Sequence, residues 1–244
     1  MNITVRNLDK SFGKKQVLYG IDFSIKSGDI VCLLGPSGSG KTTLIRCLIG
    51  AIKADNGLID YDEVAVPSLK LMSNIGFMPQ NDALYDDLTG EANLQFFAGL
   101  HGMSRKQSKN RIDEVLRLVK LSDDRNKYVV NYSGGMKKRL SLAAALLHNP
   151  NVLLLDEPTV GIDPILSKSI WAELKKLKQN GVTLIVSTHV MDEVSECDKA
   201  ALLYNGRLIN YDSVDNLLKN TQSGKIEELF FIAAETFEGG ETNA

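Results

Sequence analysis

The sequence has few cysteines, and none of them is paired. Its three cysteines, Cys32, Cys47 and Cys197, are odd in number, widely spaced and without a CxxC pair. This spacing argues against a disulfide framework and against a zinc site. We therefore expect all three to be small apolar side chains of the core, in a protein from a reducing compartment.

Long apolar runs and an excess of one charge are also absent. No stretch approaches the roughly 20 apolar residues that span a bilayer, and none at the start resembles a signal peptide, so we expect a cytosolic chain. With 28 basic and 30 acidic residues, the formal net charge is −2, which gives no electrostatic case for wholesale binding to nucleic acid. Basic clusters occur at 105–111, 137–139 and 175–178, and a solvated helix face explains them at least as well as a polyanion site.

Both ends of the chain show an alternation of strand and helix patterns. The length of 244 residues, 43% of them hydrophobic, is ample for one domain with a lobe or for two small domains. The unbroken apolar run Ile30–Leu34 is typical of a strand buried on both faces. Before it, β-rich segments alternate with turn residues. Near the other end, an Asn205-Gly206 pair between two apolar segments predicts a tight β-hairpin.

The middle of the chain has a different pattern. From about residue 81 to 131, apolar residues recur at helical intervals, which indicates a helical subdomain inserted into an α/β core. We expect a single domain over 1–220, with core segments 1–80 and 132–212. A C-terminal tail over 221–244 follows, and we expect its polar end to be disordered.

A phosphate-binding loop is predicted by a perfect match to G-x-x-x-x-G-K-[ST] at residues 35–42. The match follows a buried strand and opens a helix, as this loop requires, and that context disfavours a chance match in a Gly/Ser segment. The glycines let backbone N–H groups turn toward phosphates, Lys41 supplies a cation, and the Thr42 hydroxyl can ligate Mg²⁺. The expected nucleotide contacts are Gly35, Pro36, Ser37, Gly38, Ser39, Gly40, Lys41, Thr42 and Thr43.

Two adjacent carboxylates end a second apolar run. In "NVLLLDEPTV" (151–160), Asp156 and Glu157 close a predicted buried strand, where charge is costly without a partner. With a phosphate loop upstream, we expect Asp156 to bind the Mg²⁺ of the nucleotide. Glu157 is then left to polarise the water that attacks the γ-phosphate. The alternative is a pair of solvated acids at the start of a loop.

Four further motifs resemble those of the ABC-type ATPases and come in that family's order. They are "FMPQ" with a Q-loop-like Gln80, "YSGGM" (132–136) like the signature motif, "GIDP" (161–164) like the D-loop, and "STHVMDE" with a switch-like His189. Each motif is weak alone. Together they come in the family's order, with the helical insert between Gln80 and Ser133. The resemblance to the family extends over about residues 2–220.

The signature-like segment also has a direct physical meaning. Ser133 at a helix start, followed by Gly134 and Gly135, presents bare backbone donors and the positive end of a helix dipole. That is a second phosphate site on a chain that already has one. The plainer interpretation is an ordinary helix cap with a flexible lead-in.

The resemblance implies a fold, ligands and roles. It implies an α/β fold, a P-loop NTPase core of the ABC-ATPase type with an N-terminal antiparallel β subdomain and an inserted α-helical subdomain. It also implies ATP and Mg²⁺ as ligands, in a head-to-tail dimer where one subunit's signature covers the γ-phosphate held by the other. Gln80 would reach Mg²⁺ and the water, and His189 would contact the γ-phosphate and hold the water with Glu157. Asp163 would lie at the dimer contact, and Phe12 stands where the family has an aromatic that stacks on adenine.

These four residues also have plainer interpretations. Gln80 could be a loop amide, His189 a hydrogen-bonded histidine, Asp163 a turn residue, and Phe12 a core or strand-end phenylalanine. His101 and His148 lie in no comparable context, and we assign them no role.

The signature departs from its commonest form, because Tyr132 and Met136 take the places of Leu and Gln. A glutamine could close a capping box with Ser133, whereas methionine cannot. Together with "EPTVGIDP" and "IEELFF" near the end, "YSGGM" resembles the branch of drug, antibiotic and lipid exporters whose ATPase is encoded apart from the membrane subunit.

This branch implies a transporter motor that is peripheral on the inner face of the cell membrane. The implied partners are a second ATP-binding subunit, identical or different, and an integral membrane permease. Apolar residues within 82–88 and 94–100 are candidates for the face that docks on the permease, and the alternative is that they form the core of the lobe.

A soluble ABC-type ATPase acting on ribosomes or DNA is the alternative function. Chains that resemble the ABC ATPases of translation have two cassettes on one chain. Chains that resemble those of DNA repair have a cassette interrupted by coiled coils or zinc modules. This chain has one cassette, scattered cysteines, no heptad arm and no net positive charge, so we expect no nucleic-acid partner. An ordinary P-loop kinase would leave "SGGM" and His189 unexplained.

Overall fold

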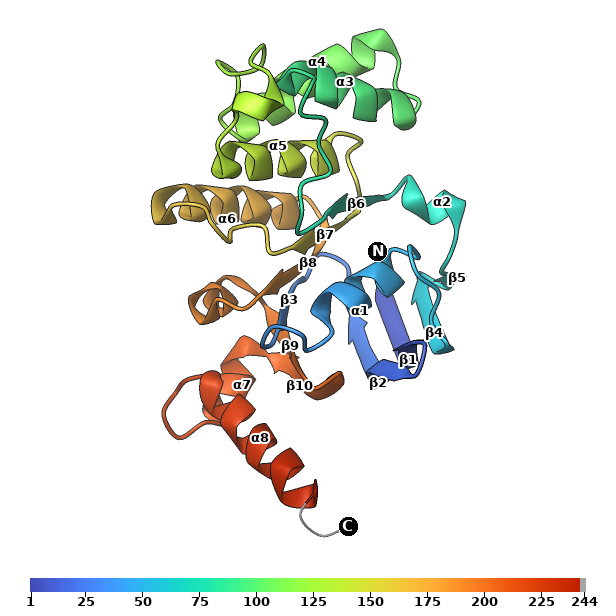
Figure 1. The fold of residues 1–244 in the computed structure, drawn as a ribbon, viewed down its shortest axis with the longest axis vertical. Coiled ribbons are helices and arrows are strands. Elements are labelled where there is room, and N and C mark those ends of the chain that lie inside the picture. Colours follow the sequence, from blue (N-terminus) through green and yellow to red (C-terminus); the bar gives the residue numbers. More distant parts are fainter. Residues whose placement is uncertain (242–244) are drawn as a thin grey trace. The chain divides into compact units, whose positions relative to one another are not determined.

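In the computed structural model of the protein, the structure describes residues 1–241 (Figure 1). The chain divides into two compact units. The first joins Met1–Ser68 to the chain from Ile185 onward, and the second is Leu69–Leu184. The boundary falls within β8 (Thr183–Thr188), a strand that is buried along its whole length.

The first unit contains the predicted antiparallel subdomain. Strand β1 (Ile3–Phe12) pairs with β2 (Lys15–Ile25) on one side and with β4 (Asn56–Tyr61) on the other, and the short β5 (Val64–Ala65) follows beside β4. Gly13, at φ 60°, makes the turn between the first two strands. Alternate side chains of β1 are buried near its start, as expected for a sheet with one covered face.

The same unit carries the strand that leads to the phosphate loop. Strand β3 (Ile30–Leu34) is buried at every position, as its apolar run predicts. It runs parallel to β9 (Lys199–Tyr204), and β9 returns as the antiparallel β10 (Arg207–Ser213). Between them, Asn205 and Gly206 have φ of 46° and 75°, which confirms the predicted tight hairpin turn.

Three helices complete the first unit: α1 (Lys41–Leu48), α7 (Val214–Lys219) and α8 (Glu227–Glu241). The acidic segment Met191–Glu196 is a 3₁₀ helix. Cys32 lies in an apolar cluster with Leu202 and Leu229, and the partly buried Cys197 packs against it. All three cysteines are free thiols, as predicted.

Helix α8 lies within the predicted C-terminal tail. Ile226, which precedes the helix, and Leu229 within it are buried and pack into the apolar cluster of the first unit. These contacts anchor a helix whose bounds are Glu227–Glu241. The expected disorder of the polar end stays a prediction, and residues 242–244 lie outside the described residues.

The second unit contains the predicted helical segment. Its parallel strands are β6 (Ile75–Met78) and β7 (Val152–Asp156). Its helices are α2 (Leu69–Met72), α3 (Gly90–Leu100), α4 (Arg105–Leu118), α5 (Gly134–Leu146) and α6 (Pro164–Gln179), with a 3₁₀ turn at Val129–Asn131. Because this unit also holds two strands of the α/β pattern, the boundaries 81–131 of a separate helical subdomain stay a prediction.

Side-chain caps set where the helices of the second unit begin. At the start of α4, Ser104 and Gln107 form a complete capping box, and a single side-chain oxygen caps each of α3, α5 and α6. Within residues 1–241, the helices are too short or too polar to cross a bilayer.

His101 and His148, to which the sequence assigns no role, stack on one another in the second unit. Their ring centroids lie 3.8 Å apart with planes 9° from parallel, and His148 Nε2 lies 3.1 Å from the Ile75 carbonyl oxygen. Burial, with help from His101 and then Arg111, lowers the pKa of His148 to about 4. Burial also lowers the pKa of His101.

This pKa predicts a loss of stability in mild acid. Because an unfolded histidine titrates at about 6.5, the unfolded chain binds more protons between about pH 6.5 and about pH 4. His148 thus favours the folded state above about pH 6.5, and this contribution is lost as the pH falls toward 4. We expect the midpoint temperature of thermal unfolding to be lower at about pH 5 than at about pH 7. The difference between the two pH values should be smaller in His148→Gln.

The control for this thermal-unfolding series is His189→Gln, which removes an exposed imidazole and leaves the stacked pair intact. It should show the full fall of the native protein. Equal falls in His148→Gln and in the native chain would contradict the role given to the buried imidazole.

Candidate functional site

Glycine sets the path of the loop between β3 and α1. A Cβ atom at Gly35 would lie 2.2 Å from the Leu203 carbonyl oxygen of β9, so no larger residue fits there. Gly38 and Gly40 have φ of 82° and 105°, a region that other residues rarely adopt. The loop has the conformation that the phosphate-binding motif predicts.

Helix α1 begins without a side-chain acceptor. Its N-cap is Gly40, no side chain caps it, and its first turn contains no acidic residue. Its first backbone N–H groups and the positive end of its dipole are therefore not neutralised by a cap. Such a helix start favours an anion, and phosphate is the ligand that this loop sequence predicts.

Lys41 points its ammonium group back over the loop. Its Nζ donates to the carbonyl oxygens of Gly35 at 2.7 Å and Pro36 at 3.1 Å, and the side chain is nearly fully buried. The hairpin turn holds the same loop, because Gly206 N donates to Ser39 O at 3.1 Å. The motif predicts that Lys41 supplies a cation at this loop. The hydrogen bond from Gly206 to Ser39 depends on tertiary structure and was not predictable from a local sequence pattern.

Two further predicted residues belong to the first unit. Phe12 ends β1 with 51% of its surface exposed, and Lys10 Nζ lies 5.5 Å from the centroid of its ring. This exposure disfavours a core position, whereas the place of Phe12 at the end of β1 agrees with its plainer interpretation as a strand-end phenylalanine. His189 follows β8 directly and is exposed. Both are accessible to a ligand, but their predicted contacts with adenine and the γ-phosphate stay predictions.

In the second unit, parallel pairing brings two predicted residues together. Met78 lies opposite Leu155 in the register of β6 and β7, so the residues that follow both strands meet at one edge of the pair. There, Gln80 Nε2 donates to Glu157 Oε2 at 2.9 Å. The sequence predicts both residues for the site but not this contact, which depends on the register of the two strands.

The backbone of Glu157 is held in an unusual conformation. Its φ is 55°, which for a residue other than glycine costs about 1–3 kcal/mol. Lys138 Nζ donates to the Glu157 carbonyl oxygen at 2.7 Å and so restrains this turn. Asp156, the last residue of β7, is only 1% exposed, and the Glu157 carboxylate accepts from Gln80. These observations disfavour a pair of solvated acids.

The basic cluster at 137–139 has structural partners. Lys137 pairs with Asp86 at 2.6 Å, Lys138 restrains Glu157, and Arg139 donates to the carbonyl oxygens of Val119 and Lys120 at 2.9 Å. These contacts give all three side chains of this partly exposed helix face a structural role. Lys138 is a supporting residue of the site that the sequence did not single out, because its target is a backbone atom on a distant loop.

Ser133 caps α5 as predicted, with its Oγ accepting from Met136 N at 3.2 Å. A Cβ atom at Gly134 or Gly135 would meet nothing within 4 Å, and neither glycine has a left-handed φ. Within residues 1–241, then, neither packing nor backbone conformation requires glycine at these two positions. This helix start is open to a group from outside the chain.

Asp163 has an evident local role. Its side chain caps α6 by accepting from Leu166 N at 3.0 Å, and Pro164 occupies the first helical position. This supports its interpretation as a turn and cap residue. Its predicted place at a dimer contact stays a prediction.

Comparisons with known proteins agree with the motifs. The chain matches the ABC transporter family over residues 18–160. It is 38% identical to ABC transporter G family member 20 of Dictyostelium discoideum, covering 93% of this chain and 32% of that protein. It therefore spans about a third of the length of this relative.

Two bacterial relatives are closer in length. Linearmycin resistance ATP-binding protein LnrL of Bacillus subtilis is 36% identical, with 95% of this chain and 78% of that protein covered. Daunorubicin resistance ATP-binding protein DrrA3 of Streptomyces coeruleorubidus is also 36% identical, with 92% and 72% covered.

Solved structures show the same fold. An ATP-binding subunit of an ABC transporter superposes with a TM-score of 0.85 at 26% identity, covering 95% of this chain and 98% of that one. A dimeric post-hydrolysis state of the cassette MJ0796, bound to ADP and Pi, gives 0.81 at 27% identity, covering 86% and 98%. Since the family match covers more than half of the residues, this chain belongs to the ABC transporter family and has the α/β fold of its ATPase domains.

Proposed function

We propose that the chain binds and hydrolyses ATP in a head-to-tail dimer that drives a separate membrane subunit. The observation that carries this proposal is the presence of two open helix starts, at Gly40 and at Ser133. The first belongs to a complete phosphate loop. The second keeps two glycines that the described chain does not itself require, which supports a phosphate held by another subunit as its ligand.

The residues divide into binding and chemical roles. Lys41 and the backbone donors of 35–43 bind the phosphates, and Phe12 stacks on the adenine. Mg²⁺, when bound, neutralises charge on the β- and γ-phosphates. The hydroxyl of Thr42, the amide of Gln80 and the carboxylate of Asp156 fit this ion, because Mg²⁺ prefers oxygen ligands and takes few of them from protein.

Glu157 is the proposed general base for the attacking water, and His189 holds that water from the side of the γ-phosphate. The side-chain amide of Gln80 can contact Glu157 and Mg²⁺ at the same time. Its nitrogen donates to Glu157, which leaves its oxygen for Mg²⁺. A base placed in this way contributes about 10²- to 10⁴-fold to the rate.

An aromatic surface supports docking on a membrane permease. Tyr85 and Phe96 are 45% and 40% exposed, and their rings meet edge to face at 4.8 Å between centroids. Phe97 adjoins Phe96 at 5.6 Å, and Leu100 is exposed one turn on. Such an exposed apolar group is typical of an interaction site, and all four residues lie within the segments that the sequence predicts.

The names of the relatives favour export as the direction of transport. LnrL and DrrA3 are resistance ATP-binding proteins for linearmycin and daunorubicin. We therefore propose that the exported compound is a drug, an antibiotic or a lipid-like molecule. The chain would then work on the inner face of the cell membrane, paired with a second ATP-binding subunit.

Lys41→Ala tests the phosphate loop. Loss of the ammonium group should slow ATP hydrolysis by about 10²-fold or more and weaken ATP binding, because it removes a positive charge from the phosphates. Phosphate release and an ATP titration measure the two effects. Lys14→Ala, an exposed lysine of the β1–β2 turn, is the matched control, and unchanged turnover in Lys41→Ala would remove Lys41 from the site.

Glu157→Gln tests the base and the dimer together. The variant should bind ATP, hydrolyse it about 10²- to 10⁴-fold more slowly, and sediment as a dimer only with ATP. Adding Ser133→Arg should leave ATP binding to the monomer nearly intact and prevent that dimer, since Ser133 acts on the other subunit. A Glu157→Gln protein that stays monomeric with ATP bound would count against the paired arrangement.

Co-purification from native membranes tests the partner. A tagged chain, extracted with mild detergent, should bring with it a polytopic membrane protein, and Tyr85→Ser combined with Phe96→Ser should reduce its recovery. The control is Leu69→Ser, which changes a residue that is 87% exposed in the same unit. Recovery of ribosomes or DNA complexes, or of no membrane protein, would contradict the transporter function.

A further inference from the structure

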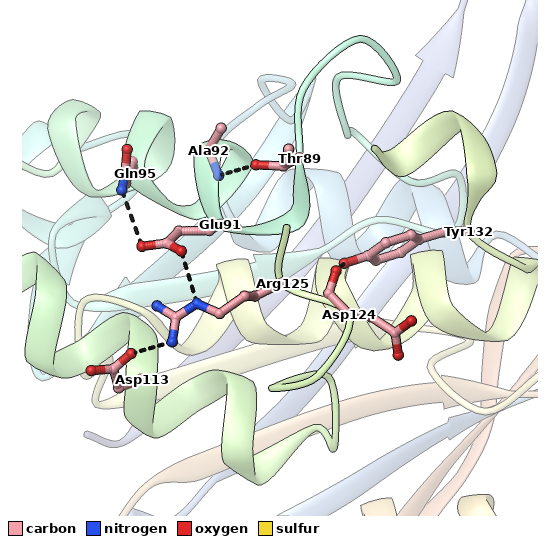
Figure 2. A network of polar contacts seen from close by, with 8 residues as sticks. All are labelled: Thr89, Glu91, Ala92, Gln95, Asp113, Asp124, Arg125 and Tyr132. Carbon is pink, nitrogen blue, oxygen red and sulfur yellow. Dashed lines mark hydrogen bonds and ion pairs between the residues drawn. The ribbon is translucent and has the colours of Figure 1, made fainter. Parts of the chain in front are cut away.

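The residue that precedes Ser133 is fixed from two sides. Tyr132 is nearly buried, and its phenol donates to the Asp124 carbonyl oxygen at 2.9 Å (Figure 2). The commonest signature has Leu here, which could not make this bond. The bond ties the residue beside the signature serine to a loop eight residues earlier.

Gly90 provides the space for this phenol. A Cβ atom at Gly90 would lie 2.2 Å from the Tyr132 hydroxyl oxygen and 3.2 Å from the ring carbon that bears it. Gly90 is the first residue of α3, where alanine is ordinarily the better helix former, and its φ is not left-handed. The glycine is therefore explained by Tyr132 and not by the backbone.

The loop that accepts the hydrogen bond is itself held firmly. Arg125, next to Asp124, pairs through Nε with Glu91 of α3 and through Nη1 with Asp113 of α4, both at 2.8 Å (Figure 2). Glu91 N also donates to Arg125 O at 2.9 Å. All three side chains are partly buried, so these pairs are screened less than pairs at an open surface.

The body of α5 is held by separate contacts. Lys137 pairs with Asp86, and Arg139 donates to the end of α4. A change at Tyr132 should therefore leave the helix in place and act on its first residues, which include Ser133.

We propose that Tyr132 is a positioning residue of the ATPase, whose phenol, seated against Gly90 and bonded to Asp124, fixes Ser133 for the nucleotide of the partner subunit. This inference rests on the proposed function. If Ser133 occupies its working position for only a fraction of the time, the apparent affinity of the dimer falls by that fraction. Binding of ATP to the isolated monomer should be unaffected.

The experiment uses the full chain with Glu157→Gln, in which ATP-bound dimers persist. Gly90→Ala should raise the dissociation constant of the dimer about tenfold, because its Cβ displaces the phenol. Adding Tyr132→Phe removes the clashing oxygen and should return the affinity to that of Tyr132→Phe alone. Tyr132→Phe alone should weaken the dimer about threefold to fivefold, as expected for one lost hydrogen bond.

Gly99→Ala is the matched control, since it is in the same helix and its Cβ would meet nothing within 4 Å. Sedimentation with ATP gives the dimer affinity, an ATP titration gives binding to the monomer, and both are done well below the unfolding temperature of each variant. A purely structural role of Tyr132 would lower the unfolding midpoint and leave the dimer affinity unchanged.

Three results would overturn the inference: native dimer affinity in Gly90→Ala, failure of Tyr132→Phe to improve the dimer affinity of Gly90→Ala, or weakened ATP binding to the monomer. If Gly90→Ala does not fold, Tyr132→Phe alone decides by its dimer affinity. If Glu157→Gln with native Tyr132 forms no dimer with ATP, the proposed function itself fails, and the inference fails with it.

Discussion

The proposed chemistry depends on the attraction between phosphate anions and uncovered backbone N–H groups at two helix starts. At α1, Gly40 leaves the first turn without a side-chain acceptor. At α5, Ser133 caps one N–H group, and the two glycines that follow keep the approach open. The start of a helix attracts an anion through fixed backbone N–H groups and the helix dipole, so this attraction does not require a charged side chain. In the proposed dimer, the two starts that face one nucleotide belong to different subunits.

The acid groups are placed by a different constraint, the register of parallel strands. Because β6 and β7 run side by side, Gln80 and Glu157 leave the pair at the same edge and form a hydrogen bond. Lys138 then restrains the left-handed backbone of Glu157. The proposed base is thus held by its side chain and by its carbonyl group, which limits the reorganisation needed during reaction.

Local patterns predicted those parts of the structure that local physics controls. The buried strand β3, the Asn205-Gly206 turn and the Ser133 cap follow from burial, backbone conformation and capping within a few residues. The family resemblance supplied the rest of the candidate residues and the order of the elements. Long-range contacts were not predictable, because Lys138, the His101–His148 stack and the Gly90–Tyr132 contact each join residues far apart in sequence. Helix α8 was not predicted for a similar reason, since the contacts of Ile226 and Leu229 anchor it.

The most direct test is a structure of the Glu157→Gln chain determined with ATP and Mg²⁺. We expect a dimer with two nucleotides, each held by the phosphate loop of one protomer, with the partner's Ser133 and the partner's Gly135 within hydrogen-bond distance of the γ-phosphate. A protomer that binds ATP alone, or a dimer in which Ser133 faces away from both nucleotides, would contradict the proposed arrangement.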